Sequence, residues 1–576
     1  MTPAPALAGA LVAAVERAGY RVDRLTPAES DAESVTIAGV EIAATPGSGR
    51  SDTPSFAREA PTRRLPDPAA VHAVVHSTAS SLDGRGVAPG VDPGADFDVL
   101  IIGTGGAGVA AAIQAAGMGA KVAIVEGGTL GGTCVNLGCI PSKTLVEAAA
   151  HVHAARRGFP GVAPCKPAVD WREVVRQKDA LVRELRQAKY ADVLASYPGV
   201  ARLEGRARLL ASDGNGASGG AVRVRVGDGS SAREHLARKV IVATGSAAAL
   251  PVIPGIETVD ALTSTSAMEL ETLPASMLVL GGGPVGVELG QTFARFGVKV
   301  AIVQRGTHLL PGEDAEIAES LRQALEAEGI EVHTSTTAVR AERDGGVEDG
   351  SKGGVVVHVR QGGLEGQVRA ERVLAATGRR PNTHDVGLEE VGVALSPGGY
   401  VQVDATMQTT NPDIYAAGDV TGGPGYVYVA AAGGRVAAEN ALKALHATGT
   451  TSEDPRELDL SAVPSVTFTA PQVASVGLTE AAARAAGYHV DVATLDMADV
   501  PRALVSYDRR GVVKLVTESG SGRILGVHAV APNAGEFMGE ATLAIRFGLT
   551  AKDLSGTLHP YLTWMESLKL VAQGGS

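Results

Sequence analysis

Residues 98–126 read DVLIIGTGGAGVAAAIQAAGMGAKVAIVE: an apolar run, a glycine turn, an alanine-rich segment and a second apolar run that ends in an acid. This order predicts a strand, a helix and a second strand, joined by a turn that contains Gly103, Gly105 and Gly108. Glycines there let a pyrophosphate approach the helix N-terminus, and Glu126, 18 residues after Gly108, can bind a ribose hydroxyl pair. We therefore predict a Rossmann-like dinucleotide-binding unit in an α/β fold.

Directly after this unit, residues 131–143 read GGTCVNLGCIPSK. Cys134 and Cys139 are two of only 3 cysteines in the chain, and four residues separate them. Zinc sites usually have tighter spacing and a second ligand pair. Two ordinary buried thiols are a further possibility, but a redox-active dithiol that opens a helix fits better, because a helix N-terminus stabilises a thiolate. Since the pair follows the first unit so closely, we predict that this unit binds FAD and that the dithiol lies against the flavin.

A second dinucleotide-binding unit begins at residues 277–290, MLVLGGGPVGVELG. There the glycine fingerprint is repeated by Gly281, Gly283 and Gly286. Two such units in one chain indicate two dinucleotides. The next strand ends in Gln304 and Arg305, where a site for NAD would carry an acid. A basic residue in that place favours a 2′-phosphate, so we predict NADPH as the second nucleotide.

Two further segments have features expected beside a flavin. Residues 411–420, NPDIYAAGDV, end a predicted strand at Asp419, whose carboxylate can meet the ribityl chain. The helix predicted next begins near Val427, so its N-terminus would point at the isoalloxazine ring. The remaining predicted cofactor-binding positions are Thr133, Gly245 and Gly378.

The composition limits the partners and the location of the chain. Its formal net charge is −12 and its pI is about 5.6, so it repels nucleic acid and anionic membrane surfaces, and we expect neither as a partner. No window approaches the roughly 18 apolar residues of a membrane span, and the apolar residues 6–15 lack a basic leader. Since cysteine is also scarce, we expect a cytoplasmic protein without a signal peptide.

The dithiol segment, both glycine fingerprints, ATGRRPNT at 376–383 and NPDIYAAGDV together resemble the pyridine nucleotide–disulfide oxidoreductase family over residues 96–570. The resemblance implies FAD and NADPH as cofactors and a homodimer whose active sites use residues of both chains. It also implies two Rossmann-like domains and an α+β dimerisation domain. The predicted boundaries are 95–255 and 385–460 for the FAD domain, 256–384 for the NADPH domain and 461–576 for the dimerisation domain.

The N-terminal residues lie outside this resemblance. Residues 1–25 contain an amphipathic helix and a short strand, similar to the end of a heavy-metal-associated domain but without its Cys-x-x-Cys loop. A degenerate remnant of that domain and an unrelated helix fit this pattern equally well. Residues 26–94 are rich in Pro, Ser, Ala and Gly, which predicts a mostly disordered linker.

Within the family, residues 559–570, HPYLTWMESLKL, resemble the mercuric reductase branch, because Tyr561 stands where other branches have threonine and Glu566 follows His559 by seven residues. This resemblance implies a reductase that converts Hg(II) to Hg(0), with Cys134 and Cys139 as the soft ligands of the metal. It also implies that Tyr190 and Tyr561 flank the metal; packing in the core is the alternative role for these tyrosines. Lys143 is implied to lie near the flavin and to pair with Glu288; a surface ion pair is the alternative for these two residues.

Two alternatives remain open at this point. A dihydrolipoamide dehydrogenase-like disulfide reductase would use His559 and Glu566 as a proton relay, and a flavoprotein without turnover would only sequester metal. Mercuric reductases usually end in a vicinal cysteine pair that collects Hg(II), whereas no cysteine follows Cys165 in this sequence. We therefore expect Hg(II) turnover that is slow or inhibited by thiol ligands.

Overall fold

The computed structural model describes residues 34–37, 40–43, 94–211, 221–344, 353–446 and 454–574. Strands β1 (Ser34–Ile37) and β2 (Val40–Ala43) form an antiparallel pair inside the segment predicted as a linker. They belong to a unit separate from the rest of the described chain. The helix predicted within residues 1–25 lies outside the described residues.

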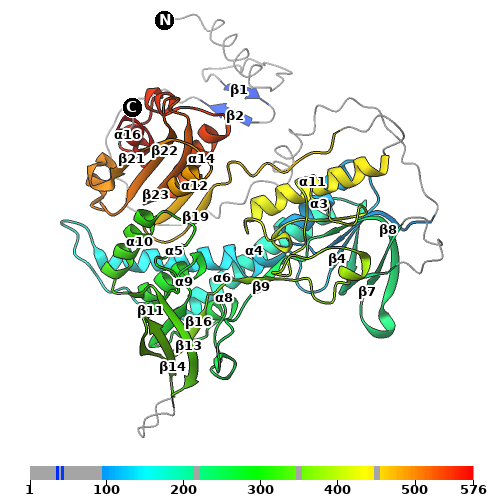
Figure 1. The fold of residues 1–576 in the computed structure, drawn as a ribbon, viewed down its shortest axis with the longest axis horizontal. Coiled ribbons are helices and arrows are strands. Elements are labelled where there is room, and N and C mark those ends of the chain that lie inside the picture. The colour runs from blue at the N-terminus through cyan, green and yellow to red at the C-terminus, as the bar shows by residue number, and fades with distance from the viewer. Residues whose placement is uncertain are drawn as a thin grey trace, which may run out of the picture. The chain divides into compact units, whose positions relative to one another are not determined.

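The first large sheet contains the strand–turn–helix unit predicted at its centre. Its 7 strands are mostly parallel and buried, and their apolar runs pack helices α3 (Gly106–Gly117) and α11 (Val427–His446) against one face (Figure 1). Along β3, Val99 and Ile101 face these two helices, whereas Leu100 and Ile102 face the opposite core. The strands are, in sheet order, β5 (Val200–Glu204), β4 (Val122–Glu126), β3 (Phe97–Ile102), β8 (Arg233–Val242), β7 (Val222–Val226) and β6 (Ala207–Leu210), with β18 (Ile414–Ala416) also paired to β8.

The second dinucleotide unit is inserted after β9 (Ser246–Ala248), and the chain returns through β17 (Arg379–Pro381), which pairs with β9. Its parallel sheet has the order β12 (Glu331–His333), β11 (Lys299–Val303), β10 (Ser276–Leu280) and β16 (Arg372–Ala375). Helices α9 (Pro284–Arg295) and α10 (Ala315–Ala327) follow β10 and β11, and an antiparallel sheet is formed by β13 (Thr336–Arg343), β14 (Val355–Gln361) and β15 (Leu364–Ala370).

The C-terminal part is an antiparallel sheet covered by helices. The order of its 5 strands is β19 (Ser465–Thr467), β20 (Gln472–Gly477), β23 (Ile524–Ala531), β22 (Val512–Glu518) and β21 (Val490–Asp496). The main helices are α12 (Glu480–Ala485), α14 (Ala534–Arg546), α15 (Ala551–Gly556) and α16 (Glu566–Gly574). The predicted fold class, two Rossmann-like units with an α+β C-terminal domain, is thereby confirmed.

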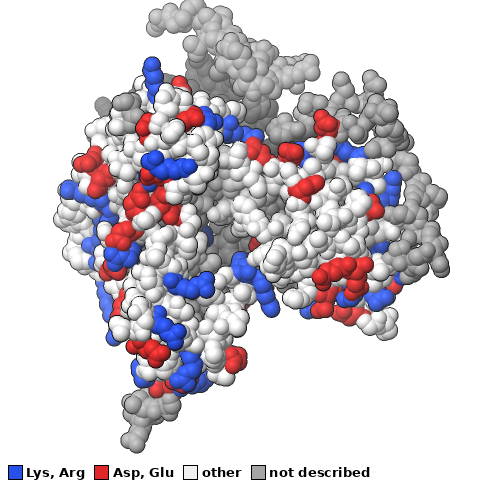
Figure 2. All heavy atoms as spheres, viewed as in Figure 1, with Lys and Arg blue, Asp and Glu red and all other residues white. Residues whose placement is uncertain are grey.

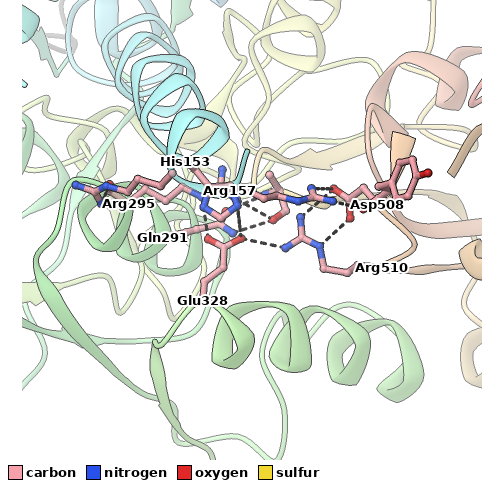
Figure 3. A network of polar contacts seen from close by, with 10 residues as sticks. His153, Arg157, Gln291, Arg295, Glu328, Asp508 and Arg510 are labelled. Atoms are coloured by element: carbon pink, nitrogen blue, oxygen red, sulfur yellow. Dashed lines mark hydrogen bonds and ion pairs between the residues drawn. The ribbon is translucent and has the colours of Figure 1, made fainter. Parts of the chain in front are cut away.

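An ion network joins these parts at the C-terminal end of α5 (Cys139–Arg157) (Figure 3). Arg295 of α9 donates to both carboxylate oxygens of Glu328, at 2.8 and 2.7 Å, and Arg510 donates to the same carboxylate at 3.0 Å. Arg157, at the end of α5, donates to Asp508 at 3.1 Å. Because these partners come from all three parts of the fold, the network holds α5 and α9, the helices that carry Cys139 and Glu288, in a defined arrangement.

Over the described residues, the face drawn in Figure 2 carries no large patch of only positive or only negative side chains. Lys and Arg are interspersed with Asp and Glu over that face in Figure 2. Among the residues that the structure describes, none of the helices has the length and apolar content needed to cross a membrane.

Candidate active site

The two cysteines lie on consecutive helices beside the first glycine turn. Cys134 is on the short helix α4 (Gly132–Asn136), and Cys139 is the first residue of α5, as predicted for a dithiol that opens a helix. Both thiols are free. A Cβ on Gly132 would lie 2.5 Å from Cα of Gly105, so the dithiol segment packs directly on the turn between β3 and α3.

A hydrogen bond between the thiols makes them chemically unequal. Cys134 donates to Cys139, which lowers the pKa of the Cys139 thiol to about 7 against the opposing effect of burial, and the Lys143 ammonium acts in the same direction as the hydrogen bond. The same hydrogen bond and burial raise the pKa of Cys134. Cys139 is therefore the more readily ionised of the two thiols, and Cys134 is the one that keeps its proton.

Lys143 is held by a buried carboxylate. Its Nζ lies 2.6 Å from Oε2 of Glu288 on α9, and the Glu288 side chain is 7% exposed. The other oxygen of Glu288 accepts the backbone N–H of Phe468 at 2.7 Å. The Phe468 ring lies 4.7 Å from the Lys143 ammonium, close enough for a cation–π contact. Glu288 thus joins the dithiol helix to the C-terminal domain.

Tyr190 lies beside the dithiol because the helix that carries it changes pitch. A π-turn, Gln187–Ala191, separates α6 (Trp171–Arg186) from α7 (Asp192–Ala195). A Cβ on Gly131 would lie 3.3 Å from the Tyr190 ring. Burial, followed by the neighbouring Cys134 and Cys139, raises the pKa of Tyr190 to about 12, so its hydroxyl stays protonated beside the sulfurs. π-turns often occur at functional sites.

The C-terminal candidates are arranged differently from the predicted relay. His559 pairs with Glu540 of α14, with Nε2 2.8 Å from Oε1, and its Nδ1 lies 2.9 Å from the carbonyl oxygen of Thr557. Glu566 instead accepts the backbone N–H of Leu562 at 3.1 Å. The relay of His559 and Glu566 that the disulfide reductase alternative would use is not formed within this chain, because α14 brings Glu540 to the histidine. Tyr561 is 70% exposed.

The first glycine turn forms a cradle that fits the adenosine and pyrophosphate of FAD. Gly103 has φ +109°, and a Cβ on Gly108 would lie 1.9 Å from the carbonyl oxygen of Gly103. A cavity of about 330 Å³ opens beside Glu126. That carboxylate accepts the N–H of Gly128 at 2.6 Å and the hydroxyl of Thr104, and it keeps lone pairs for a ribose.

The residues predicted to lie at the flavin end also form one group. Asp419, which follows β18, accepts a hydrogen bond from Ser246 at 2.7 Å and lies 3.7 Å from the Arg379 guanidinium. Among the described residues, no group hydrogen-bonds the buried hydroxyl of Thr244, which is therefore an unused polar group just after β8. Val427 begins α11 and packs against the glycine turn, since a Cβ on Gly106 would lie 2.8 Å from its side chain. This end of the site therefore fits the rest of FAD. Gly245, at φ +71°, directly follows Thr244. Thr133 lies on α4 next to Cys134.

The second glycine turn has the same backbone features. Gly281 has φ +107°, and a Cβ on Gly286 would lie 2.0 Å from its carbonyl oxygen. Helix α9 begins with Pro284 and has Gly283 at its N-cap. Arg305 is exposed directly after Gln304. A Cβ added to Gly378, at φ +129°, would meet no atom of the described residues within 4 Å. The start of α9 thus has the backbone form that binds a pyrophosphate, with a cation near the end of β11.

Sequence analysis did not predict the contacts by which four residues hold the site together. Thr104 binds Glu126, and its place inside the first glycine fingerprint was a usable signal. Gln304 accepts the N–H of Gly282 at 3.1 Å. No sequence motif marks Phe468 or Glu540, because each binds a residue of another segment. Phe468 binds Glu288, 180 residues away, and Glu540 binds His559.

Comparisons with known proteins agree with this geometry. Residues 97–434 match the pyridine nucleotide-disulphide oxidoreductase family model, and residues 463–572 match the dimerisation domain of that family. The chain is 45% identical over 479 residues to a mercuric reductase of Streptomyces lividans, covering 83% of this chain and 96% of that protein. It is 43% identical over 478 residues to a mercuric reductase of Shigella flexneri, covering 82% of this chain and 80% of that protein.

Two solved structures share this fold. The flavoprotein disulfide reductase RclA of Escherichia coli superposes with a TM-score of 0.69 at 29% identity, over 83% of this chain and 99% of that chain. LpdA of Mycobacterium tuberculosis gives 0.70 at 28% identity, over 82% and 98% of the two chains. With a dithiol on the first of two dinucleotide turns and a C-terminal sheet that matches the dimerisation model, the chain belongs to the pyridine nucleotide-disulphide oxidoreductase family.

Proposed function

We propose that this chain uses NADPH to reduce Hg(II) to Hg(0) at Cys134 and Cys139. The observation that carries the proposal is the dithiol itself: two free cysteines, one with its pKa lowered to about 7, next to Tyr190. Thiolates are soft ligands and prefer soft metal ions. The similarity to proteins named mercuric reductases supports the same substrate.

Family membership implies FAD and a nicotinamide nucleotide as cofactors, and the two glycine turns fit them. The residues proposed to hold FAD are Gly103, Gly105, Gly108, Glu126, Thr133, Gly245, Asp419 and Val427, and those for the nicotinamide nucleotide are Gly281, Gly283, Gly286, Arg305 and Gly378. When bound, the cofactors supply the two electrons that convert Hg(II) to Hg(0).

The residues of the chain bind the metal and manage its protons. Cys139 binds Hg(II) as the thiolate that is already present, and Cys134 gives up its proton to become the second ligand. Lys143 stabilises the thiolate of Cys139 before the metal binds and again after Hg(0) leaves two thiolates, and Glu288 keeps its ammonium in place. Uptake of two electrons turns the bound ion into Hg(0), which leaves, and Cys134 takes its proton back.

We propose NADPH rather than NADH because of the two residues after β11. The side chain of Gln304 is turned into the glycine turn, where it accepts the N–H of Gly282, and it carries no charge to repel a 2′-phosphate. Arg305 is exposed beside it. Replacing Arg305 with Ala should raise the KM for NADPH roughly tenfold and leave the KM for NADH unchanged. Equal effects on both nucleotides would contradict this assignment.

We further propose a cytoplasmic homodimer with shared sites. The match to the dimerisation domain supports the dimer, and the exposure of Tyr561 leaves its phenol free to serve the dithiol of a second chain. Free thiols persist best in a reducing compartment.

A disulfide reductase is the second candidate, because His559 and Glu540 form the histidine–carboxylate pair that such an enzyme uses for proton transfer. Two observations count against it. The His559 side chain is 2% exposed, and both ring nitrogens face acceptors within this chain. A histidine in this position is poorly placed to reach a disulfide substrate, whereas Tyr561 is accessible.

The test is anaerobic oxidation of NADPH by the FAD-loaded protein, with Hg(II), lipoamide or glutathione disulfide as acceptor and with volatile mercury measured alongside. We expect NADPH oxidation and Hg(0) release with Hg(II) only. Cys139→Ser should abolish both, while Cys165→Ser, which changes an exposed cysteine outside the site, should leave both unchanged. Rapid reduction of a disulfide without Hg(0) release would favour the second candidate, and metal binding without NADPH oxidation would indicate sequestration.

A further inference from the structure

A polar row crosses the face of the C-terminal sheet, away from the dithiol. Ser475 on β20 is the direct register partner of His528 on β23, and His528 is the partner of Lys514 on β22. Directly paired residues on neighbouring strands share a face of the sheet, so the three side chains stand side by side. The Lys514 side chain is 1% exposed, which is unusual for an ammonium group.

Helix α10 lies next to the C-terminal sheet (Figure 1), and three acids at its start, Glu313, Asp314 and Glu316, contact this row. Lys514 Nζ lies 3.0 Å from Asp314 and also contacts Glu316. Glu313 accepts the hydroxyl of Ser475 at 2.8 Å, and its other oxygen lies 3.4 Å from Nδ1 of His528. These contacts join the second dinucleotide unit to the C-terminal domain through an acidic segment of four residues, 313–316.

Lys514 is the centre of this contact. Its Nζ also lies 3.0 Å from Glu480 on α12, so the three donors of the ammonium face three carboxylates. The described residues contain no group of three or more His, Cys, Asp or Glu arranged to hold a metal ion. The lysine is therefore the cation that neutralises the three carboxylates.

The acidic segment continues directly from the residues that support the second glycine turn. Leu310 donates its N–H to the carbonyl oxygen of Gly282 at 2.8 Å, and Glu313 donates its N–H to Leu310 at 2.9 Å. A Cβ on Gly282 would lie 2.6 Å from the Leu309 side chain. Two successive backbone hydrogen bonds thus link Glu313 to Gly282 of the second glycine turn.

We propose that Lys514 is a positioning residue for the nicotinamide nucleotide, acting from the C-terminal domain through the acidic segment 313–316 on the glycine turn at Gly282. Without the ammonium, the carboxylates of Asp314, Glu316 and Glu480 would repel one another at close range. The segment would then separate from the sheet, and the turn would lose the support of Leu309 and Leu310. The FAD cradle lies on another sheet and would keep its shape.

The test compares Lys514→Met with Lys178→Met in the FAD-loaded full chain. Lys178 is a matched control, because its side chain is also buried, at 3% exposed. Its ammonium contacts the carbonyl oxygen of Met268 and the carboxylate of Asp179, both at 2.9 Å, and neither residue belongs to the acidic segment. Equilibrium binding of NADP⁺ is measured by calorimetry. We expect Lys514→Met to raise the Kd for NADP⁺ about tenfold, while FAD content stays complete and Lys178→Met leaves that Kd unchanged.

Steady-state NADPH oxidation with an artificial quinone acceptor gives a second readout that needs no Hg(II). The KM for NADPH should rise with the Kd, kcat should change by less than about twofold, and Lys514→Arg should restore most of the affinity. If Lys514→Met does not fold, Glu316→Gln removes one partner from a half-exposed position and should raise the Kd about two- to threefold. Unchanged NADP⁺ binding in a folded Lys514→Met, or in Glu316→Gln where Lys514→Met is unfolded, would overturn the proposal, whatever the outcome with Hg(II).

Discussion

At the scale of single residues, one hydrogen bond decides which sulfur of the dithiol is charged. Cys134 donates and Cys139 accepts, so the proton stays on the first sulfur and the charge resides on the second, near Lys143. A spacing of four residues between the cysteines does not specify this direction. It follows from the helix start at Cys139 and from the lysine one turn further along α5.

The first prediction concerns the pH dependence of Cys139. Because its pKa is lowered to about 7, the thiolate is present above that pH and is lost as the pH falls through it. Alkylation of the reduced protein by iodoacetamide, followed by peptide mapping, should therefore show a midpoint near pH 7 at Cys139. Cys134→Ala removes the donor and should move the midpoint upward, whereas Cys134→Ser keeps a donor and should move it less. A midpoint at the pH of an ordinary cysteine would contradict the assignment.

At the scale of elements, the first turn of α3 depends on the absence of a side chain at one position. A Cβ on Gly108 would lie 1.9 Å from a carbonyl oxygen, whereas a Cβ on Gly117, at the end of the same helix, meets nothing within 4 Å. The helix can approach β3 only if residue 108 is glycine.

The second prediction follows from this contrast. Gly108→Ala should yield protein with little bound FAD, measured as flavin absorbance per mole of purified chain, because the turn must open to admit the methyl group. Gly117→Ala should bind FAD fully, and its helix should be slightly more stable because alanine has the higher helix propensity. Full FAD content in Gly108→Ala would show that the turn adapts.

The third prediction concerns the face of α9 that meets the dithiol helix and the C-terminal domain. Glu288 is buried and serves both Lys143 and Phe468, so Glu288→Ala should destabilise the protein by about 3 kcal/mol. Glu319→Ala is the control, because Glu319 pairs with Arg322 on the surface of α10 and should cost less than about 1 kcal/mol. The comparison is made by thermal unfolding of FAD-loaded protein, and equal midpoints for the two variants would contradict it.

At the scale of the whole molecule, the proposed shared site can be tested by complementation. Cys139→Ser and Tyr561→Phe are produced together with different tags, and the mixed dimer is purified. If each site combines the dithiol of one chain with Tyr561 of the other, the mixed dimer has one intact site and about half of the normal Hg(II) reductase activity. Each single variant alone should be nearly inactive.

The alternative arrangement gives a different result in the same experiment. If Tyr561 served the dithiol of its own chain, neither chain of the mixed dimer would hold an intact site, and activity would not recover. Because both variants keep the C-terminal sheet intact, loss of dimer formation would be visible separately by sedimentation.

Much of the fold and of the cofactor chemistry was predictable from local patterns. The two glycine fingerprints, the helix start at Cys139 and the acid Glu126 are properties of short segments, because strand, turn and helix preferences act over a few residues. The family was predictable for the same reason, because motifs in a fixed order can be recognised without knowledge of long-range contacts. The family models confirm that assignment.

Contacts between groups that are distant in the sequence could not be predicted in this way. Lys143 and Glu288 were predicted to pair, but the N–H and ring of Phe468 that complete their site come from the C-terminal sheet. The disulfide reductase alternative would pair His559 with Glu566, whereas the structure pairs it with Glu540. Lys514 meets its carboxylates across two domains. The sequence by itself determined the turns, helix starts and cofactor-binding units, since these depend on neighbouring residues. The partners of buried charges depend on how the domains pack, and sequence spacing contains no record of that packing.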